Sequence, residues 1–241
     1  MSDAAQHCSF QALVLAGDRG ATDPLLAQSE AGYMNLMKLN SCAYLKGDGQ
    51  VPQVSLDELA QYNAGLICLT GGPDGPVGRL LRQGQRPKAE ALMDRLAATY
   101  PDRIYVELQR HPGDGGLPEA ERLSERGHIE MAYAKDLPLV ATNDAYFPKT
   151  ELFEAHDALI CISEGAYVDQ QEPRRRLTPQ HYFKSPQEMV TLFADLPEAI
   201  ENTVEIARRC AFKVYKRDPI LPKFADDEVA ELRRQAQAGL K

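Results

Sequence analysis

Three short apolar runs, separated by helical patterns, constrain the fold of this chain most strongly. The runs cover residues 66–69, 104–108 and 139–141, and each has the composition of a buried strand. The segments between them have the apolar spacing of amphipathic helices. Strands that alternate with helices are the signature of a parallel sheet or barrel, so we expect an α/β fold.

Polar residues follow each predicted strand. Gly71 and Gly72 follow the first, His111 the second, and Asn143 and Asp144 the third. Functional groups in parallel α/β folds lie at the carboxyl ends of the strands, so these residues are predicted to converge on one site. Asn143 and Asp144 are equally typical of a simple chain turn. A metal centre needs three or more protein ligands, whereas the pattern supplies one histidine and one carboxylate.

The helices are predicted from apolar spacing and from start signals. Ser55 with Glu58, and Ser185 with Glu188, have the spacing of capping boxes. The expected helices cover residues 31–45, 55–62, 77–83, 88–100, 119–134 and 152–162, then two begin at Ser185 and Asp195, and a charged one at 226–240 is detached from the α/β part. The helix that begins at Asp195 is predicted to bury Ile200, Val204, Ala207 and Ala211.

Composition excludes several classes of protein. The 241 residues carry a formal net charge of −8, which disfavours a domain whose main task is binding nucleic acid. Five scattered cysteines without a CxxC pair predict reduced thiols and argue against a zinc ribbon. The apolar runs are too short to span a membrane and no N-terminal signal is visible, so we expect a cytoplasmic protein.

Residues 11–17 predict a further strand, which runs into a turn at Gly17–Gly20. Such a turn can bind phosphate through its backbone N–H groups. The segment resembles the nucleotide-binding start of the molybdenum-cofactor type nucleotidyltransferases. It contains few glycines, so an ordinary strand and turn is the preferred interpretation.

Seven segments resemble, in consistent order, the alpha subunit of bacterial DNA polymerase III. They are residues 25–39, 67–72, 106–111, 140–144, 153–156, 193–203 and 220–224. The matching part is the middle to the end of the family's N-terminal PHP (polymerase and histidinol phosphatase) domain. We therefore predict that residues 1–24 do not match the family, that residues 25–222 form a partial PHP domain, and that residues 223–241 begin a helical connection toward a palm domain.

The resemblance implies a partial, distorted (β/α)7 barrel with C-terminal helices and a metal site at the carboxyl ends of its strands. The family's cysteine ligand corresponds to Gly72, its later histidine to His111, and its closing Asp-x-His pair to Asp144 and Tyr146; its earlier ligands would precede Leu25. His111 and Asp144 are thus the predicted remnant of the metal site. A phenol with a pKa near 10 replaces imidazole poorly. We therefore expect no cofactor, although an intact family site binds zinc or manganese.

The resemblance also implies a parent function in DNA replication, as a DNA-directed DNA polymerase whose palm aspartates hold two metal ions. This chain stops before any palm, so we expect a structural role, docking other polymerase III holoenzyme subunits and especially the epsilon proofreading subunit, with no direct nucleic-acid or membrane partner. Two alternatives stay open: a residual metal-dependent phosphoesterase using His111 and Asp144, and a nucleotidyltransferase built on residues 13–20.

The remaining histidines have weaker patterns. His156 lies in an apolar helical stripe and is expected to be a hydrogen-bonded core residue. His7, His128 and His181 have no partner pattern and are expected at the surface.

Overall fold

The computed structural model describes residues 23–45, 52–113, 115–170, 177–216, 218–219 and 221–240. The strand predicted at residues 11–17 and His7 lie outside the described residues. None of the described helices is both long and apolar enough to cross a membrane.

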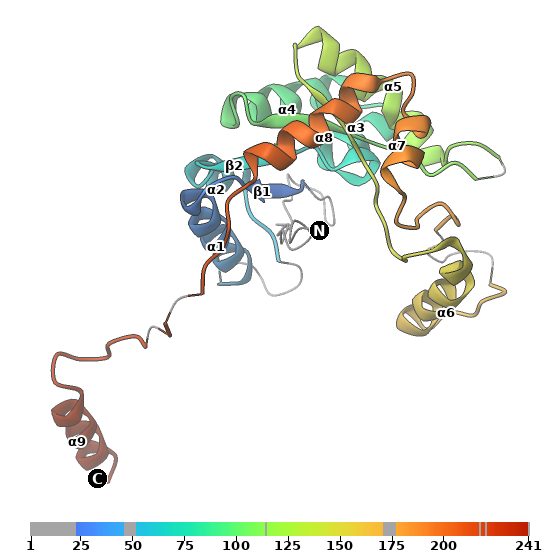
Figure 1. Ribbon diagram of the computed structural model, residues 1–241. Coiled ribbons are helices and arrows are strands. Elements are labelled where there is room, and N and C mark those ends of the chain that lie inside the picture. Colours follow the sequence, from blue (N-terminus) through green and yellow to red (C-terminus); the bar gives the residue numbers. More distant parts are fainter. Residues whose placement is uncertain are drawn as a thin grey trace.

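A four-stranded mixed sheet forms the centre of the molecule (Figure 1). The strands, in the spatial order β1-β2-β3-β4, are Leu25–Ala27, Leu66–Leu69, Ile104–Gln109 and Leu139–Thr142. The three predicted strands are confirmed as β2, β3 and β4, and they pair in parallel. β1 pairs antiparallel with β2, and no strand was predicted at these residues. The sheet is not closed, and the (β/α)7 barrel stays an expectation.

The described helices match the predicted ones within a few residues. They are α1 Glu30–Leu45, α2 Leu56–Gln61, α3 Pro76–Arg82, α4 Arg86–Thr99, α5 Glu119–Ala134, α6 Phe153–Glu164, α7 Pro186–Leu192, α8 Pro197–Arg209 and α9 Glu228–Gly239, with short 3-10 turns η1 Gly72–Asp74 and η2 Thr150–Leu152. Both predicted capping boxes are present: Ser55 and Ser185 each accept the backbone N–H of the glutamate three residues later, and that glutamate accepts the N–H of the serine.

The two faces of the sheet pack against different helices because neighbouring side chains of a strand point to opposite sides. One face carries Cys68, Val106 and Ala141, and it packs in the main core with α1, α4 and α5. The other face carries Ile67, Tyr105 and Val140, and Ile206 of α8 covers it. α8 therefore lies across this second face (Figure 1).

The predicted buried stripe of α8 holds only for Ile200, which is half-buried and packs against the main core, whereas Val204, Ala207 and Ala211 are exposed. Ala199 and Ile206 are buried, whereas Val204 is 51% exposed. Asn202 lies between these two buried residues on the helix, and its Nδ2 donates a hydrogen bond to Leu139 O at 2.8 Å. A polar residue therefore lies on the sheet-facing side of α8, which is why apolar spacing selected the wrong side.

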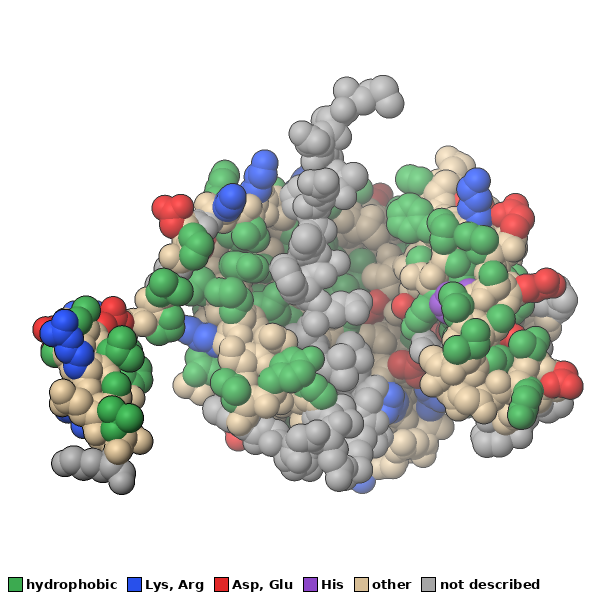
Figure 2. All heavy atoms as spheres, turned by 90° about the horizontal axis from the view of Figure 1, so that it is seen from below, with side chains coloured by type: hydrophobic (Ala, Val, Ile, Leu, Met, Phe, Trp, Pro, Cys, Tyr) green, Lys and Arg blue, Asp and Glu red, His purple; other side chains and the backbone are tan. Residues whose placement is uncertain are grey.

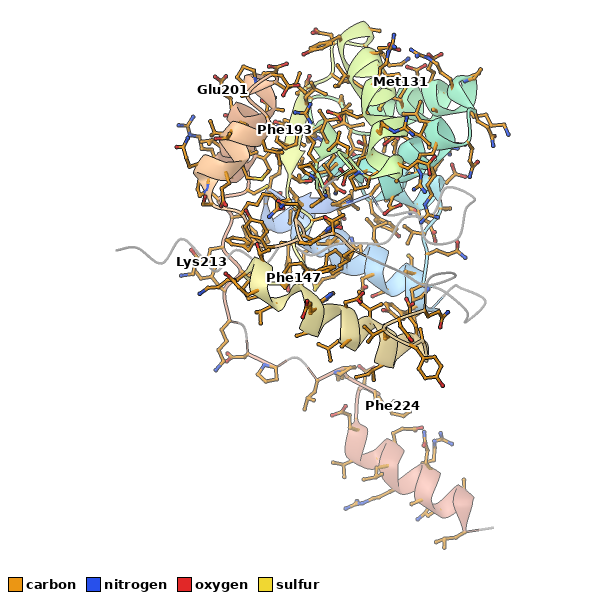
Figure 3. The ribbon with its side chains drawn as sticks, turned by 90° about the vertical axis from the view of Figure 1, so that its right-hand side faces the viewer. Met131, Phe147, Phe193, Glu201, Lys213 and Phe224 are labelled. Carbon is orange, nitrogen blue, oxygen red and sulfur yellow. The ribbon has the colours of Figure 1, made fainter. Side chains whose placement is uncertain are left out.

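α6 and α9 project from the rest of the molecule (Figure 1). α6 buries Ile160 and Cys161 but leaves Leu159 62% exposed. Figure 3 shows Phe147 between α6 and the sheet part, and Phe224 near the start of α9. No residue of α9 is buried, as expected for a detached helix.

Candidate functional site

His111 follows β3 directly and is held by the helix that comes next in the chain. Glu121, in the first turn of α5, accepts the backbone N–H of His111 at 2.8 Å through one carboxylate oxygen. Its other oxygen lies 2.7 Å from His111 Nδ1. Both side chains are buried, with 1% and 5% of their surface exposed. The two bonds fix the orientation of the imidazole, because they restrain the ring and its backbone together.

His181 brings the distant segment 177–184 onto His111. The two imidazole rings stack with their centroids 3.8 Å apart and their planes inclined by 7°. Thr178 supports the stack: its N–H donates to His181 Nδ1 at 3.1 Å, and its hydroxyl donates to His111 O at 3.3 Å. The segment is also fixed to the chain after β4, because the N–H of Tyr146 donates to His181 O at 2.9 Å.

We call His111, Glu121 and His181 the histidine cluster. One potential ligand atom of each lies within 4.8 Å of the others, so by proximity the cluster is a candidate cation site.

His128 and His181 were predicted at the surface, and both are buried; that prediction was wrong. Burial lowers the pKa of His128 to about 4, because a charged imidazole loses its hydration there.

The hydrogen bonds of the histidine cluster occupy most of its ligand atoms. Glu121 uses both oxygens on His111. His181 Nδ1 lies 3.1 Å from both N and Oγ1 of Thr178 and 3.2 Å from Thr178 O, so Thr178 surrounds this nitrogen. His111 Nε2 is buried and has no hydrogen-bond partner among the described residues. Zinc needs three or four lone pairs that converge in the planes of the rings, whereas these rings are stacked.

The other predicted ligand, Asp144, is not a member of the histidine cluster. It follows β4, is half-buried, and its charge contributes to raising the pKa of Glu107. Its neighbour Asn143 ties down the chain: Asn143 Nδ2 donates to Tyr182 O at 2.9 Å, and Lys184 Nζ donates to Asn143 Oδ1 at 3.3 Å. Asn143 thus anchors the turn.

Sequence analysis missed Glu107, a buried carboxylate that joins the ends of three strands. Glu107 is 3% exposed and accepts hydrogen bonds from the Gly71 N–H, the Gln109 amide and the Thr142 hydroxyl. Burial raises the pKa of Glu107, and the three donors lower it again. A glutamate inside an otherwise apolar predicted strand was the feature of the sequence that could have identified this residue.

Gly72, which the resemblance aligns with the family's cysteine ligand, has little room for any side chain. Its φ is +56°, and a Cβ there would lie 2.9 Å from Cδ of Gln109. A cysteine would therefore require Gln109 to move and the backbone to accept strain.

The prediction that His156 is a hydrogen-bonded core residue holds only in part, because His156 is half-buried beside Phe147, and its Nδ1 has no partner among the described residues.

Comparison with known families gives the class of this sequence. Residues 10–111 match the model of the PHP domain. The match ends at His111 and begins inside the segment 1–24 that we predicted not to match, so residues 10–24 also share the pattern of that family.

The individual relatives are more specific. The chain is 51% identical over 228 residues to DNA polymerase III subunit alpha of Caulobacter vibrioides (strain NA1000 / CB15N), with 92% of this chain and 19% of the relative covered. The same subunit of Rickettsia bellii (strain RML369-C) is 39% identical over 221 residues, with 90% of this chain and 18% of the relative covered. The subunit of Escherichia coli (strain K12) is 39% identical over 235 residues, with 94% of this chain and 20% of the relative covered.

These matches confirm the resemblance found in the sequence. The chain is similar to the PHP domain over residues 10–111 and to DNA polymerase III alpha subunits over most of its own length, and it spans about a fifth of the length of these relatives.

Proposed function

We propose that this chain is a structural, non-catalytic PHP segment whose role lies in assembling a replicative DNA polymerase. The observation that carries the proposal is the set of hydrogen bonds inside the histidine cluster. Each oxygen of Glu121 makes a hydrogen bond with His111, and His181 Nδ1 bonds with Thr178, so binding a cation would disturb contacts that hold the fold together.

The same arrangement argues against nucleotidyl transfer by this chain. Two-metal transfer needs several carboxylates that hold both ions. Within the described ranges, the histidine cluster is the only group of three or more potential ligands, and it contains one carboxylate. His111 and Asp144 are then a remnant of a family metal site, without a bound zinc or manganese.

An assembly role is supported by exposed apolar side chains on α6 and the turn before it. Leu152, Leu159 and Ile162 are 42%, 62% and 77% exposed. Figure 2 shows hydrophobic side chains gathered on this part of the surface, on the right of the view. Exposed apolar patches commonly mark protein interaction sites. The proposed partners are the other subunits of the polymerase III holoenzyme, in particular the epsilon proofreading subunit.

Activity assays test the catalytic part of this proposal. The purified chain is assayed for primer extension and for phosphomonoester and phosphodiester hydrolysis with magnesium, manganese or zinc. We expect no rate above that of a mock-purified control. A metal-dependent rate that disappears in His111→Ala would overturn the proposal.

A binding titration tests the assembly part. Labelled epsilon subunit is titrated with the chain and with Ile162→Asp, which places a charge on the exposed face of α6. We expect weaker binding for Ile162→Asp and unchanged binding for Val204→Asp, a matched change at a similarly exposed apolar residue on α8. Equal binding by the parent chain and both variants would exclude α6 as the contact.

A residual metal-dependent phosphoesterase remains the second candidate, and one observation favours it. Histidine ligands of metals characteristically donate one ring N–H to a carboxylate and keep the other nitrogen for the ion. His111 has this arrangement, with Nδ1 held by Glu121 and Nε2 buried without a partner among the described residues. The activity assays with His111→Ala distinguish the two candidates.

A further inference from the structure

Asp23, directly before β1, is a wholly buried carboxyl group. Its exposure is 0%, and neither carboxyl oxygen has a hydrogen-bond partner among the described residues. Asp23 is fixed there by the strand that follows: Pro24 O accepts the Leu69 N–H at 2.9 Å, and Leu25, also fully buried, lies opposite Cys68 in the sheet. The carboxyl group cannot reach water while β1 stays paired with β2.

The ionisable groups around Asp23 make a charge there unfavourable. Among the described residues, those that interact with it are Cys68 on β2, Tyr100 after α4 and Glu107 on β3, and none of these three is basic. The Tyr100 hydroxyl is likewise buried without a partner among the described residues. Glu107 is the contrasting case, because three donors surround its carboxylate. An ionised Asp23 would have no such compensation.

Burial therefore raises the pKa of Asp23 well above its ordinary value, and the neighbouring Glu107 raises it further. Burial also raises the pKa values of Cys68 and Tyr100, so both stay neutral at the pH values where Asp23 titrates. A carboxyl group with a raised pKa in the folded state stabilises that state fully below its unfolded pKa of about 4. This contribution is lost as the pH rises through the folded pKa.

We propose that Asp23 is a proton-dependent latch on β1, the outer strand of the sheet among the described residues. With its proton, Asp23 lies neutral in the core and β1 stays paired with β2. When β1 opens, Asp23 reaches water and releases one proton to it. The opening of β1 therefore becomes easier as the pH rises from about 4 to the raised pKa of the folded state. Opening exposes the edge of β2, which is a surface that a further strand could pair with.

Amide hydrogen exchange on the full chain tests the latch. Exchange is followed at residues 25–28 between pH 4.5 and 8, and corrected for the intrinsic pH dependence of exchange. Gln28 is a direct probe, because its N–H donates to Gly65 O at 3.0 Å. We expect the opening constant of β1 to rise by up to tenfold per pH unit, since one proton is released. Residues 92–96 of α4, a helix without a buried carboxyl group, serve as an internal reference without this slope.

Two variants assign the slope to Asp23. Asp23→Asn and Asp23→Ala both remove the titrating group, and we expect a pH-independent opening of β1 in each. The matched control is Asp102→Asn, because Asp102 is exposed and asparagine tolerates its φ of +58°. We expect this control to keep the slope of the parent chain.

The parent chain alone can refute the proposal. An opening constant of β1 that does not change between pH 4.5 and 8 would overturn it, whatever the variants do. A slope that persists in Asp23→Asn or in Asp23→Ala would also overturn it. Infrared spectroscopy supplies a readout independent of stability: the folded parent chain should show the C=O stretch of a protonated carboxyl that Asp23→Asn lacks.

Discussion

Arg110 connects the end of β3 to two helical regions, and Arg110→Ala is expected to destabilise the chain by about 3 kcal/mol. Its side chain is 12% exposed and pairs with Glu125 of α5, which is 14% exposed. It also donates to Leu192 O at 2.9 Å and makes two bonds to Asp195, of 2.6 and 2.8 Å. The guanidinium lies 4.6 Å from the ring centre of Phe193.

These contacts contribute unequally. Removing the Arg110 side chain leaves the largely buried carboxylate of Glu125 without its partner, which costs about 2–3 kcal/mol. The carbonyl of Leu192 and the ring of Phe193 each add about 1 kcal/mol. Asp195 is 62% exposed, so its ion pair adds only about 0.5 kcal/mol. The variant regains about 2 kcal/mol of side-chain entropy, which leaves a net loss of about 3 kcal/mol.

Urea unfolding of the parent chain and three variants measures this loss. We expect Arg110→Lys to retain part of the stability, because lysine keeps the charge but cannot form the forked bonds. Asp195→Asn should cost about 0.5 kcal/mol. A loss below about 1 kcal/mol in Arg110→Ala, or an equal loss in Asp195→Asn, would refute the reasoning. Arg110 lowers the pKa of Asp195, so the contribution of Asp195 should disappear as the pH falls below about 4.

Three further predictions follow from individual residues. First, zinc or manganese should leave the melting temperature of the parent chain, His111→Ala and Asp144→Asn unchanged; a metal-dependent rise in the parent that either variant loses would contradict this. Second, Ser185→Ala should cost about 1 kcal/mol in urea unfolding, because it removes the cap of α7; an unchanged midpoint would count against the role of the cap. Third, His128 is buried with a pKa of about 4, so stability should fall by up to about 1.4 kcal/mol per pH unit between pH 6.5 and 4. The part of that slope due to His128 should be absent in His128→Gln, and an identical slope in both proteins would contradict the assignment.

Local signals in the sequence were sufficient for most of the fold. The three parallel strands are continuous apolar runs, and the serines that begin α2 and α7 carry their own capping partners three residues later. β1 has no such signal. It has three residues, and its identity as a strand depends on pairing with Cys68 and its neighbours, more than 40 residues later.

The candidate site was harder to predict, because its neighbours meet only in the folded chain. His111 was identified from its position after a strand, but Glu121 is one of several acidic residues in α5, where a carboxylate near the helix start is common. His181 lies 70 residues beyond His111 and reaches it only because segment 177–184 folds back beside Tyr146. The spacing of residues along the chain therefore does not predict this contact.

The metal content of the purified chain tests the central claim most directly. The chain is saturated with zinc or manganese, passed through a desalting column, and analysed by inductively coupled plasma mass spectrometry. Because the hydrogen bonds of Glu121 and His181 would have to rearrange around an ion, we predict less than about 0.1 ion per chain, the same as for His111→Ala. About one ion per parent chain and none in His111→Ala would contradict the claim, and would make the phosphoesterase the leading function.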